Sequence, residues 1–380
     1  MRTLATIAGI VLLAAILWDG FETIILPRRV THRFRLARLF YRYSWIPWRA
    51  AAKRMKPAKR REAFLSVYGP LSLLLLFALW AAGLIFGFGL LHWAAGSALV
   101  SSPEKTTFWT DIYMSGTTFF TLGLGDIAPH TPSARFITVF ESGTGFGFLA
   151  IVISYLPVLY GAFSRREANI SLLDARAGSP PTAAELVRRH VRSRNLETLG
   201  QFLRAWEVWA AELMESHLSF PVLCYFRSQH DNQSWLAALT TILDTCALLI
   251  SCAEGALLWQ AQLTFAISRH ALVDLAQVMK VPPKHPISER LSEHDFECLR
   301  DLLASALAPA RITPDAGQKL HDLQLMYEPY LAGFSERLLM PCPPWKAATR
   351  VADNWKTSAW ERISSVSSVP VGAVLDDEHR

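Results

Sequence analysis

The stretch Thr118-Phe-Phe-Thr-Leu-Gly-Leu-Gly-Asp-Ile-Ala-Pro129 decides the fold of this chain. Within it, glycine alternates with other residues over Thr121-Leu122-Gly123-Leu124-Gly125. In an ordinary strand successive carbonyl groups point to opposite sides, and placing them on one side requires left-handed backbone at alternate residues. Glycine adopts that backbone without steric cost. Gly123 and Gly125 therefore allow a row of carbonyl oxygens that faces one way.

Such a row of oxygens suits a cation that has shed its water, because backbone carbonyls replace the lost hydration. The Thr121 hydroxyl adds one more oxygen at the inner end. The first half of segment 107–126 is predicted to form a short helix, whose negative C-terminal end points toward the ion path. Irregular backbone at membrane depth is tolerated only where it is buried in protein or lines a water-filled path.

Three flanking segments are long and apolar enough to cross a hydrocarbon core, which takes roughly 20 residues. They are predicted at about Leu4–Leu26, Phe64–Trp93 and Ser133–Phe163. Hydrophobic residues make up 51% of the chain and charged residues 18%, against about 25% charged in soluble proteins. Nearly all the long apolar runs lie in the first 165 residues, so a membrane part precedes a helical soluble part.

Basic residues mark one side of the membrane three times. Arg28 and Arg29 follow the first span, thirteen Lys or Arg and one acidic residue lie within Arg28–Glu62, and Arg165-Arg166 follow the third span. Cytoplasmic loops carry such an excess. We therefore predict an outer N-terminus, an outer pore loop and a cytoplasmic C-terminal part, and we expect no nucleic-acid partner for the basic loop.

The stretch quoted first resembles the pore signature of tetrameric potassium channels, T-x-x-T-V-G-Y-G-D-x-x-P. The resemblance covers roughly Phe64–Phe163, and Pro129, Thr131, Arg135 and Gly145 continue it. It implies a homotetramer in a bacterial plasma membrane, with potassium ions in the filter and no other cofactor. The residues that it assigns to potassium are Thr121, Leu122, Gly123 and Leu124, with Gly125 completing the filter and Asp126, Thr117 and Thr118 supporting it.

This sequence departs from the potassium-channel pattern in three places, one of which is Phe120, where the family usually has a small Thr or Ser. Leu124 replaces the usual Tyr or Phe of the filter, and Met114 stands where an aromatic residue is common. The filter loses the tether of the phenol hydroxyl, so a weakly selective cation channel is an alternative. A second alternative is a non-conducting membrane scaffold or sensor. No nucleophile elbow, HExxH motif or phosphate loop occurs, and an enzyme is not expected.

The third predicted span contains an acidic residue and a glycine-rich stretch. Glu141 is either a structural tie that hydrogen-bonds to Thr117 or Thr118 behind the filter, or a proton-sensitive element of the gate. Gly143, Gly145 and Gly147 follow within six residues, a pattern that indicates close helix packing or a bend. The candidate gating hinges are Gly143, Gly145 and Pro157, with Gly145 favoured.

The fold class predicted is an all-α membrane protein: a potassium-channel-like pore with an extra N-terminal transmembrane helix and an all-helical cytoplasmic domain. The dinucleotide-binding fingerprint GxGxxG is absent from the C-terminal part, which excludes that common type of regulatory domain. The predicted domains are a transmembrane helix at 1–27, a basic linker at 28–63, the pore at 64–164, the helical domain at 165–364 and a flexible tail at 365–380.

Two stretches of the C-terminal part carry further expectations. The segment Glu215–Trp235 gathers His217, Arg227, His230 and Asp231 near aromatic residues; it is either an ordinary packing corner or a site for an unknown cytoplasmic regulatory ligand. The acidic residues Asp244 and Glu254 interrupt the apolar run around Leu236–Ile250. This run is therefore predicted to be a buried amphipathic helix and not a fourth span.

Overall fold

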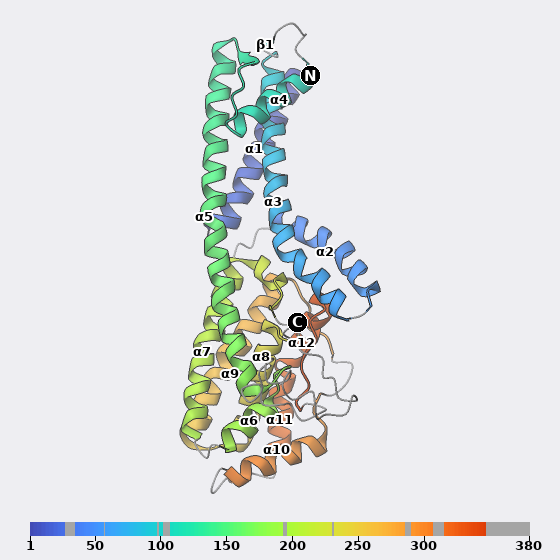
Figure 1. Cartoon of the computed structure of the whole chain (residues 1–380), viewed down its shortest axis with the longest axis vertical. Helices are drawn as coiled ribbons and strands as arrows, with labels where there is room; N and C mark the ends of the chain where they lie inside the picture. Colours follow the sequence, from blue (N-terminus) through green and yellow to red (C-terminus); the bar gives the residue numbers. More distant parts are fainter. Residues whose placement is uncertain are drawn as a thin grey trace, which may run out of the picture. The chain divides into compact units, whose positions relative to one another are not determined.

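The computed structural model describes residues 1–26, 35–56, 58–96, 99–101, 107–192, 196–229, 232–285, 290–306 and 315–346 (Figure 1). These residues form two compact units. The N-terminal unit comprises Met1–Ala52 and Val67–Gly161, and the C-terminal unit comprises Lys53–Ser66 and the chain from Ala162 onward. The helices α3 and α5 each contribute residues to both units. The predicted tail at 365–380 lies outside the described residues.

The N-terminal unit contains the predicted spans and the pore loop. Three of its helices are long and apolar enough to cross a membrane, which agrees with the three predicted segments. A short antiparallel pair, in register Leu99↔Pro129, joins the segments on either side of the pore helix. The elements are α1 (Arg2–Gly20), a π-helical segment (Phe21–Ile25), α2 (Leu36–Arg54), α3 (Ala58–Ala94), β1 (Leu99–Ser101), α4 (Phe108–Phe119), β2 (Ile127–Pro129) and α5 (Pro132–Ala177).

Small residues bring α1 close to α3. A Cβ at Gly9 would lie 2.9 Å from the Gly87 carbonyl oxygen, and one at Gly83 would lie 2.4 Å from the Ile16 side chain. Gly83 and Gly87 form a small-xxx-small pattern, which lets helix backbones approach closely within a membrane. The extra N-terminal helix is therefore packed against the outer helix of the pore and is part of this unit's core.

Acidic residues of α1 and its π-helical extension are buried. On sequence alone Asp19 and Glu22 are expected to pair with Arg28 and Arg29, which lie outside the described residues. In the structure, each of these two acidic residues has different partners. Asp19 Oδ2 accepts hydrogen bonds from Trp80 Nε1 and from the Ala37 amide, both at 3.0 Å. Glu22 Oε1 accepts from Trp18 Nε1 at 3.0 Å, and Arg35 lies 3.7 Å from its other oxygen.

The C-terminal unit is built from helices, as predicted. Thr182 caps α6, since its hydroxyl accepts from the Glu185 amide at 3.3 Å. The sequence pattern is helical throughout Ser234–Met279, but the structure has two helices there, because Gly255 adopts left-handed backbone (φ +66°) at the start of the second one. The helices are α6 (Ala183–Arg192), α7 (Leu196–Ser219), a 3-10 segment (Pro221–Tyr225), α8 (Trp235–Cys252), α9 (Gly255–Val278), α10 (Glu293–Ala306), α11 (Ala316–Leu325) and α12 (Glu328–Leu338).

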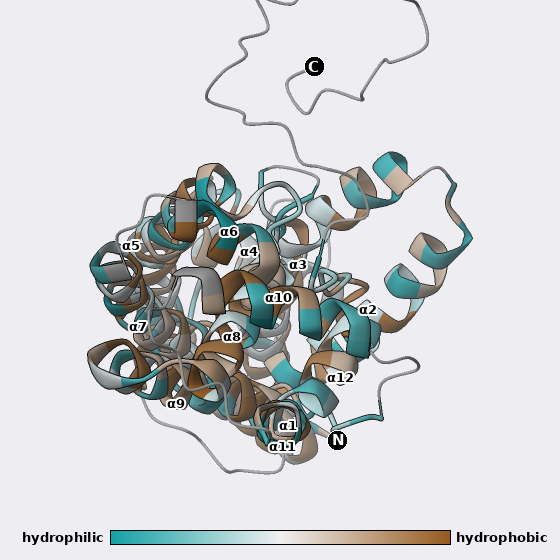
Figure 2. Cartoon of the chain, turned by 90° about the horizontal axis from the view of Figure 1, so that it is seen from below, coloured by the Kyte–Doolittle hydropathy of each residue, from teal (hydrophilic) through white to brown (hydrophobic). Residues whose placement is uncertain are grey.

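The apolar helix α8 is the centre of this unit. All of its residues are buried, and it packs against α6, α7, α9, α11 and α12. Its acidic residue Asp244 is held by Arg290 at 2.7 and 2.9 Å and by the Tyr327 hydroxyl at 2.7 Å. The helices around it show both hydrophilic and hydrophobic residues (Figure 2). By length and composition α8 is a fourth helix that could cross a membrane, but every one of its residues is buried inside this unit. The predicted burial is therefore confirmed, whereas the predicted amphipathic pattern is wrong.

Candidate functional site

The short helix predicted before the filter is α4. Thr107 caps it: the Thr107 hydroxyl accepts from the Thr110 amide at 3.4 Å, and the Thr110 hydroxyl accepts from the Thr107 amide at 3.1 Å. This reciprocal arrangement satisfies two amides at the N-terminus of the helix. Gly89 of α3 allows close packing, since a Cβ there would lie 2.4 Å from the Ile112 side chain. The helix is thus held in place before the filter begins.

The backbone of the predicted filter alternates as the glycine pattern requires. Thr121, Gly123 and Gly125 have φ values of +58°, +54° and +79°. Leu122 and Leu124, between them, have no positive φ. Left-handed backbone is expected at glycine but costs a β-branched residue about 1–2 kcal/mol. The alternation therefore extends one residue further than the glycines alone indicate.

The last turn of α4 holds the start of the filter through backbone hydrogen bonds. The Thr117 carbonyl accepts from the amides of Leu122 and Gly123, at 2.7 and 3.4 Å, and the Thr118 carbonyl accepts from the Thr121 amide at 3.0 Å. The Thr117 hydroxyl donates to the Met114 carbonyl in its own helix. Thr117 and Thr118 thus hold the backbone of Thr121–Gly123 through their carbonyl oxygens, and their role as supports of a selectivity filter stays a prediction.

The outer end of the filter is tied to the pore helix by a residue that sequence reasoning missed. The Tyr113 hydroxyl donates to Asp126 Oδ2 at 3.0 Å. The sequence signal that could have indicated this contact is the tyrosine thirteen residues before Asp126. Tyr113 is adjacent to Met114, the residue that stands where potassium channels commonly have an aromatic side chain. An aromatic hydroxyl therefore contacts this loop, although Leu124 has none.

Glu141 lies behind the pore helix with partners other than those predicted. The carboxylate is fully buried, accepts a hydrogen bond from the Ser115 hydroxyl and lies 3.2 Å from His92 Nε2. Ser115 Oγ also lies 2.7 Å from the Ile85 carbonyl oxygen, so its single hydroxyl hydrogen is shared between the two acceptors. The predicted bond to Thr117 or Thr118 is wrong, because Ser115 is the pore-helix hydroxyl that faces α5. The contact joins α3, α4 and α5.

The glycines of α5 have different surroundings. A Cβ at Gly145 would lie 2.0 Å from the Phe119 carbonyl oxygen, whereas one at Gly143 or Gly147 would meet nothing within 4 Å. Gly145 is therefore a position of close packing against the end of α4. The helix runs without interruption through these glycines and Pro157. The hinge role assigned to Gly143, Gly145 and Pro157 stays a prediction.

The residues gathered in the C-terminal candidate site fall into separate networks. His217 is buried beside Arg166, whose Nη1 lies 3.1 Å from His217 Nε2. Arg227 instead pairs with Glu62 at 3.4 Å and donates to the carbonyl oxygens of Leu338 and Leu339. The remaining predicted members, His230 and Asp231, lie outside the described residues.

Comparisons with known proteins identify the membrane part. Residues 72–159 match the family model described as "Ion channel". The chain is 25% identical over 247 residues to the uncharacterized membrane protein YdjJ of Bacillus subtilis (strain 168), an alignment that covers 64% of this chain and 71% of that protein. No solved structure matches the chain. The chain is therefore a helical membrane protein with an ion-channel domain, which spans α3 from Ser72, the pore helix, the loop after it and α5 to Leu159.

Proposed function

We propose that this chain is the subunit of a potassium-type cation channel in which four copies surround one selectivity filter. The observation that carries the proposal is the alternation of left-handed backbone at Thr121, Gly123 and Gly125, directly after a capped pore helix. That alternation turns successive carbonyl groups toward one side. Each chain supplies a single pore loop, so a closed ring of oxygens requires several copies, and four is the number of the potassium channels it resembles.

In this proposal a dehydrated cation is coordinated by carbonyl oxygens of Thr121, Leu122, Gly123 and Leu124, with Gly125 at the outer end. The C-terminal end of α4 adds a negative dipole potential toward the ion path. The protein performs no covalent chemistry, and the ion passes down its electrochemical gradient. Basic residues after the first and third spans orient the pore loop outward and the helical unit toward the cytoplasm.

The exposure of the loop in a single chain supports assembly. The side chains of Leu122 and Leu124 are 62% and 64% exposed. Apolar side chains gain free energy when they are removed from water, by roughly 25 cal/mol per Å². Neighbouring copies packed around the filter cover such groups. The helical C-terminal unit would assist this assembly or the gating, since α5 continues from the pore domain into that unit.

Potassium flux into liposomes tests the proposal. Gly123→Ala places a Cβ on a residue with φ +54°, which strains the filter backbone but leaves the packing elsewhere unchanged. We expect flux to fall to background while the variant keeps the assembly of the parent. Gly200→Ala is the control, because Gly200 lies in α7, away from the filter and the candidate hinges, and a Cβ there meets nothing within 4 Å. Equal flux from the parent and Gly123→Ala, or no flux from a correctly assembled parent, rejects the proposal and leaves the scaffold or sensor alternative.

A weakly selective cation channel is the second candidate, and Leu124 is the observation that favours it. Its side chain has no hydroxyl with which to brace the filter, and the phenol contact described here reaches Asp126 instead. A less braced filter discriminates less between ions of different size. Bi-ionic reversal potentials with potassium and sodium separate the two candidates: a value near zero identifies the weakly selective channel.

A further inference from the structure

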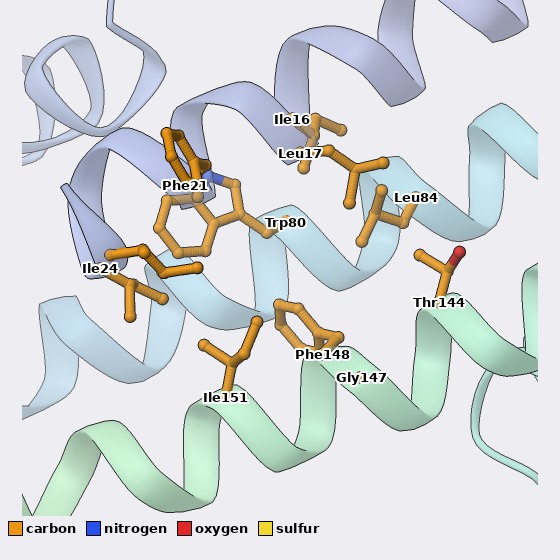
Figure 3. A pocket seen from close by; sticks show the side chains of 12 residues that line it. Ile16, Leu17, Phe21, Ile24, Trp80, Leu84, Thr144, Gly147, Phe148 and Ile151 are labelled. Atoms are coloured by element: carbon orange, nitrogen blue, oxygen red, sulfur yellow. The ribbon is translucent and has the colours of Figure 1, made fainter.

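An apolar cavity of about 280 Å³ lies among α1, α3 and α5 of the N-terminal unit (Figure 3). Its polar groups are already occupied: the Thr144 hydroxyl donates to the Phe140 carbonyl at 2.9 Å, and Trp80 Nε1 donates to Asp19. A buried water needs two to four polar partners. The cavity therefore favours hydrocarbon over water. The side chains that line it include Phe21, Ile24, Trp80, Leu84, Phe148 and Ile151.

The cavity opens to the outside of this unit. Leu17, Phe21 and Ile25 line it and are themselves 43%, 40% and 52% exposed. All three helices around it are long and apolar enough to span a membrane. An opening on the side of membrane-spanning helices faces the acyl chains of the bilayer.

The first turn of α2 lies beside the same cavity wall. Asp19 Oδ2 accepts hydrogen bonds from Trp80 Nε1 and from the Ala37 amide, each at 3.0 Å. Trp80 lines the cavity, and Ala37 is the second residue of α2. Glu22, the other buried acidic residue of this region, pairs with Trp18 and Arg35. The shared carboxylate thus brings the start of α2 next to Trp80.

The helix α2 has the composition of a helix that lies at a membrane surface. It contains five Lys or Arg and no acidic residue. At 100° per residue, Arg38, Arg42, Arg49 and Lys53 fall within one narrow arc of the helix. Another face carries apolar side chains that are exposed: Leu36, Tyr43 and Ile46 are 40%, 63% and 53% exposed. Basic and apolar faces on one helix are typical of binding to anionic lipids at the interface.

We propose that this region binds one anionic glycerophospholipid, with an acyl chain in the cavity and the phosphate headgroup on Arg38 and Arg42 at the start of α2. The two parts of the site match the two parts of that ligand: an apolar space at membrane depth and a basic helix end beside it. A membrane lipid is the occupant because the cavity opens toward the bilayer, and because the negative charge of the phosphate headgroup complements the basic residues of α2.

A lipid acyl chain in the cavity would also be coupled to the pore helix α4 through one side chain. Phe148 lines the cavity, and its ring lies 5.7 Å from that of Phe119, the last residue of α4. Phe119 is also the residue whose carbonyl oxygen lies against Gly145. An acyl chain in the cavity therefore contacts a side chain that packs on the end of the pore helix.

Native mass spectrometry of the full-length protein tests the site. The protein, purified in mild detergent, is mixed with phosphatidylglycerol or phosphatidylcholine, and retained lipids are counted per chain. We expect retention of phosphatidylglycerol in preference to phosphatidylcholine. Gly20 lines the cavity and a Cβ there meets nothing within 4 Å, so Gly20→Leu is expected to occupy part of the cavity and to abolish retention of both lipids. Ala14→Leu on the exposed side of α1 is the control.

The headgroup is tested by a pair of double variants. Arg38→Gln with Arg42→Gln should weaken phosphatidylglycerol binding by about 30-fold, from roughly 1 kcal/mol for each basic residue near anionic lipid. Lys53→Gln with Arg54→Gln removes the same charge from the other end of α2 and should leave binding unchanged. If Gly20→Leu fails to fold, Ile24→Trp fills the cavity from its rim.

Three results overturn the proposal: no preference for phosphatidylglycerol, undiminished retention after the cavity is filled, or equal loss from both double variants. The last result indicates general charge attraction to α2. Lipid retention does not require conduction. Retained lipid with absent flux therefore rejects the proposed channel function alone, and normal flux with no retained lipid rejects this site alone.

Discussion

Thr121 holds a backbone conformation that a β-branched residue seldom adopts. Its φ of +58° costs about 1–2 kcal/mol relative to ordinary backbone. Such strain persists only where the surroundings determine it and gathers at functional positions. At Thr121 the hydrogen bond from its amide to the Thr118 carbonyl holds the conformation. The strained threonine, with Gly123 and Gly125, therefore supports the assignment proposed for the filter at the scale of single residues.

Gly145 is the residue of α5 at which a methyl group cannot be accommodated. A Cβ there would lie 2.0 Å from the Phe119 carbonyl oxygen, so Gly145→Ala should destabilise the protein by at least about 1–3 kcal/mol through overpacking. At Gly143 nothing lies within 4 Å of the added Cβ, and alanine should stabilise the helix by up to about 1 kcal/mol. Thermal unfolding in detergent measures both. A transition for Gly145→Ala equal to that of the parent contradicts the close approach.

At the scale of elements, Glu141 joins the three helices of the pore. Its carboxylate contacts Ser115 of α4 and His92 of α3. All three side chains are buried. Buried polar groups are costly when they lack partners, so a mutually satisfied cluster specifies how the helices pack. This contact fixes α4 to α3 and to α5.

Glu141→Leu removes the acceptor and leaves the His92 ring beside an apolar group. The Ser115 hydroxyl keeps the Ile85 carbonyl, so the loss falls mainly on His92, and we expect destabilisation by about 1–3 kcal/mol. Glu141→Gln keeps an oxygen for the cluster and should lose less. Thermal unfolding of the two variants compares them; equal destabilisation contradicts the hydrogen-bonding role. The alternative role of Glu141, as a proton-sensitive element of the gate, is tested by measuring ion flux through Glu141→Gln as a function of pH. A pH response equal to that of the parent rejects this alternative.

A second joint connects α5 to α7 within the C-terminal unit. Arg166 is buried and donates to the carbonyl oxygens of Leu223 and Phe226, each at 3.0 Å, and pairs with Glu167 at 2.8 Å. A guanidinium only donates hydrogen bonds, so His217 Nε2, 3.1 Å from Arg166 Nη1, is the acceptor. His217 is therefore neutral in the folded protein.

Acid should weaken this joint. Burial, and then the charge of Arg166, lower the pKa of His217 well below its ordinary value of 6.5. Below pH 6.5 the unfolded chain binds a proton that the folded chain does not, so stability falls as the pH falls, by at most about 1.4 kcal/mol per pH unit for this group. The free energy of unfolding of the full chain, measured from pH 8 to pH 5, should depend less steeply on pH in His217→Gln than in the parent. Parallel curves for parent and variant contradict the assignment.

At the scale of the whole molecule, the proposed filter is complete only in an assembly. One helix, α5, carries large exposed apolar side chains along its length: Phe136, Phe140, Phe146 and Ile153 are 74%, 56%, 69% and 69% exposed. We expect four copies to associate, with part of this surface covered by neighbouring copies and the pore. Native mass spectrometry of the conducting protein should give four times the 42.5 kDa of one chain. A conducting monomer or dimer contradicts the fourfold filter.

Some of this protein follows from its sequence alone. Apolar length predicts the three spans, because a hydrocarbon core admits only segments of about 20 apolar residues. The alternation of Gly123 and Gly125 predicts left-handed backbone, because glycine alone adopts it without cost. The tertiary structure decided what depends on which helices meet: Ser115 in place of Thr117 or Thr118 as the partner of Glu141, Tyr113 as the tie to Asp126, and the enclosure of α8. Spacing along one chain does not specify such contacts, because they arise from residues of separate elements.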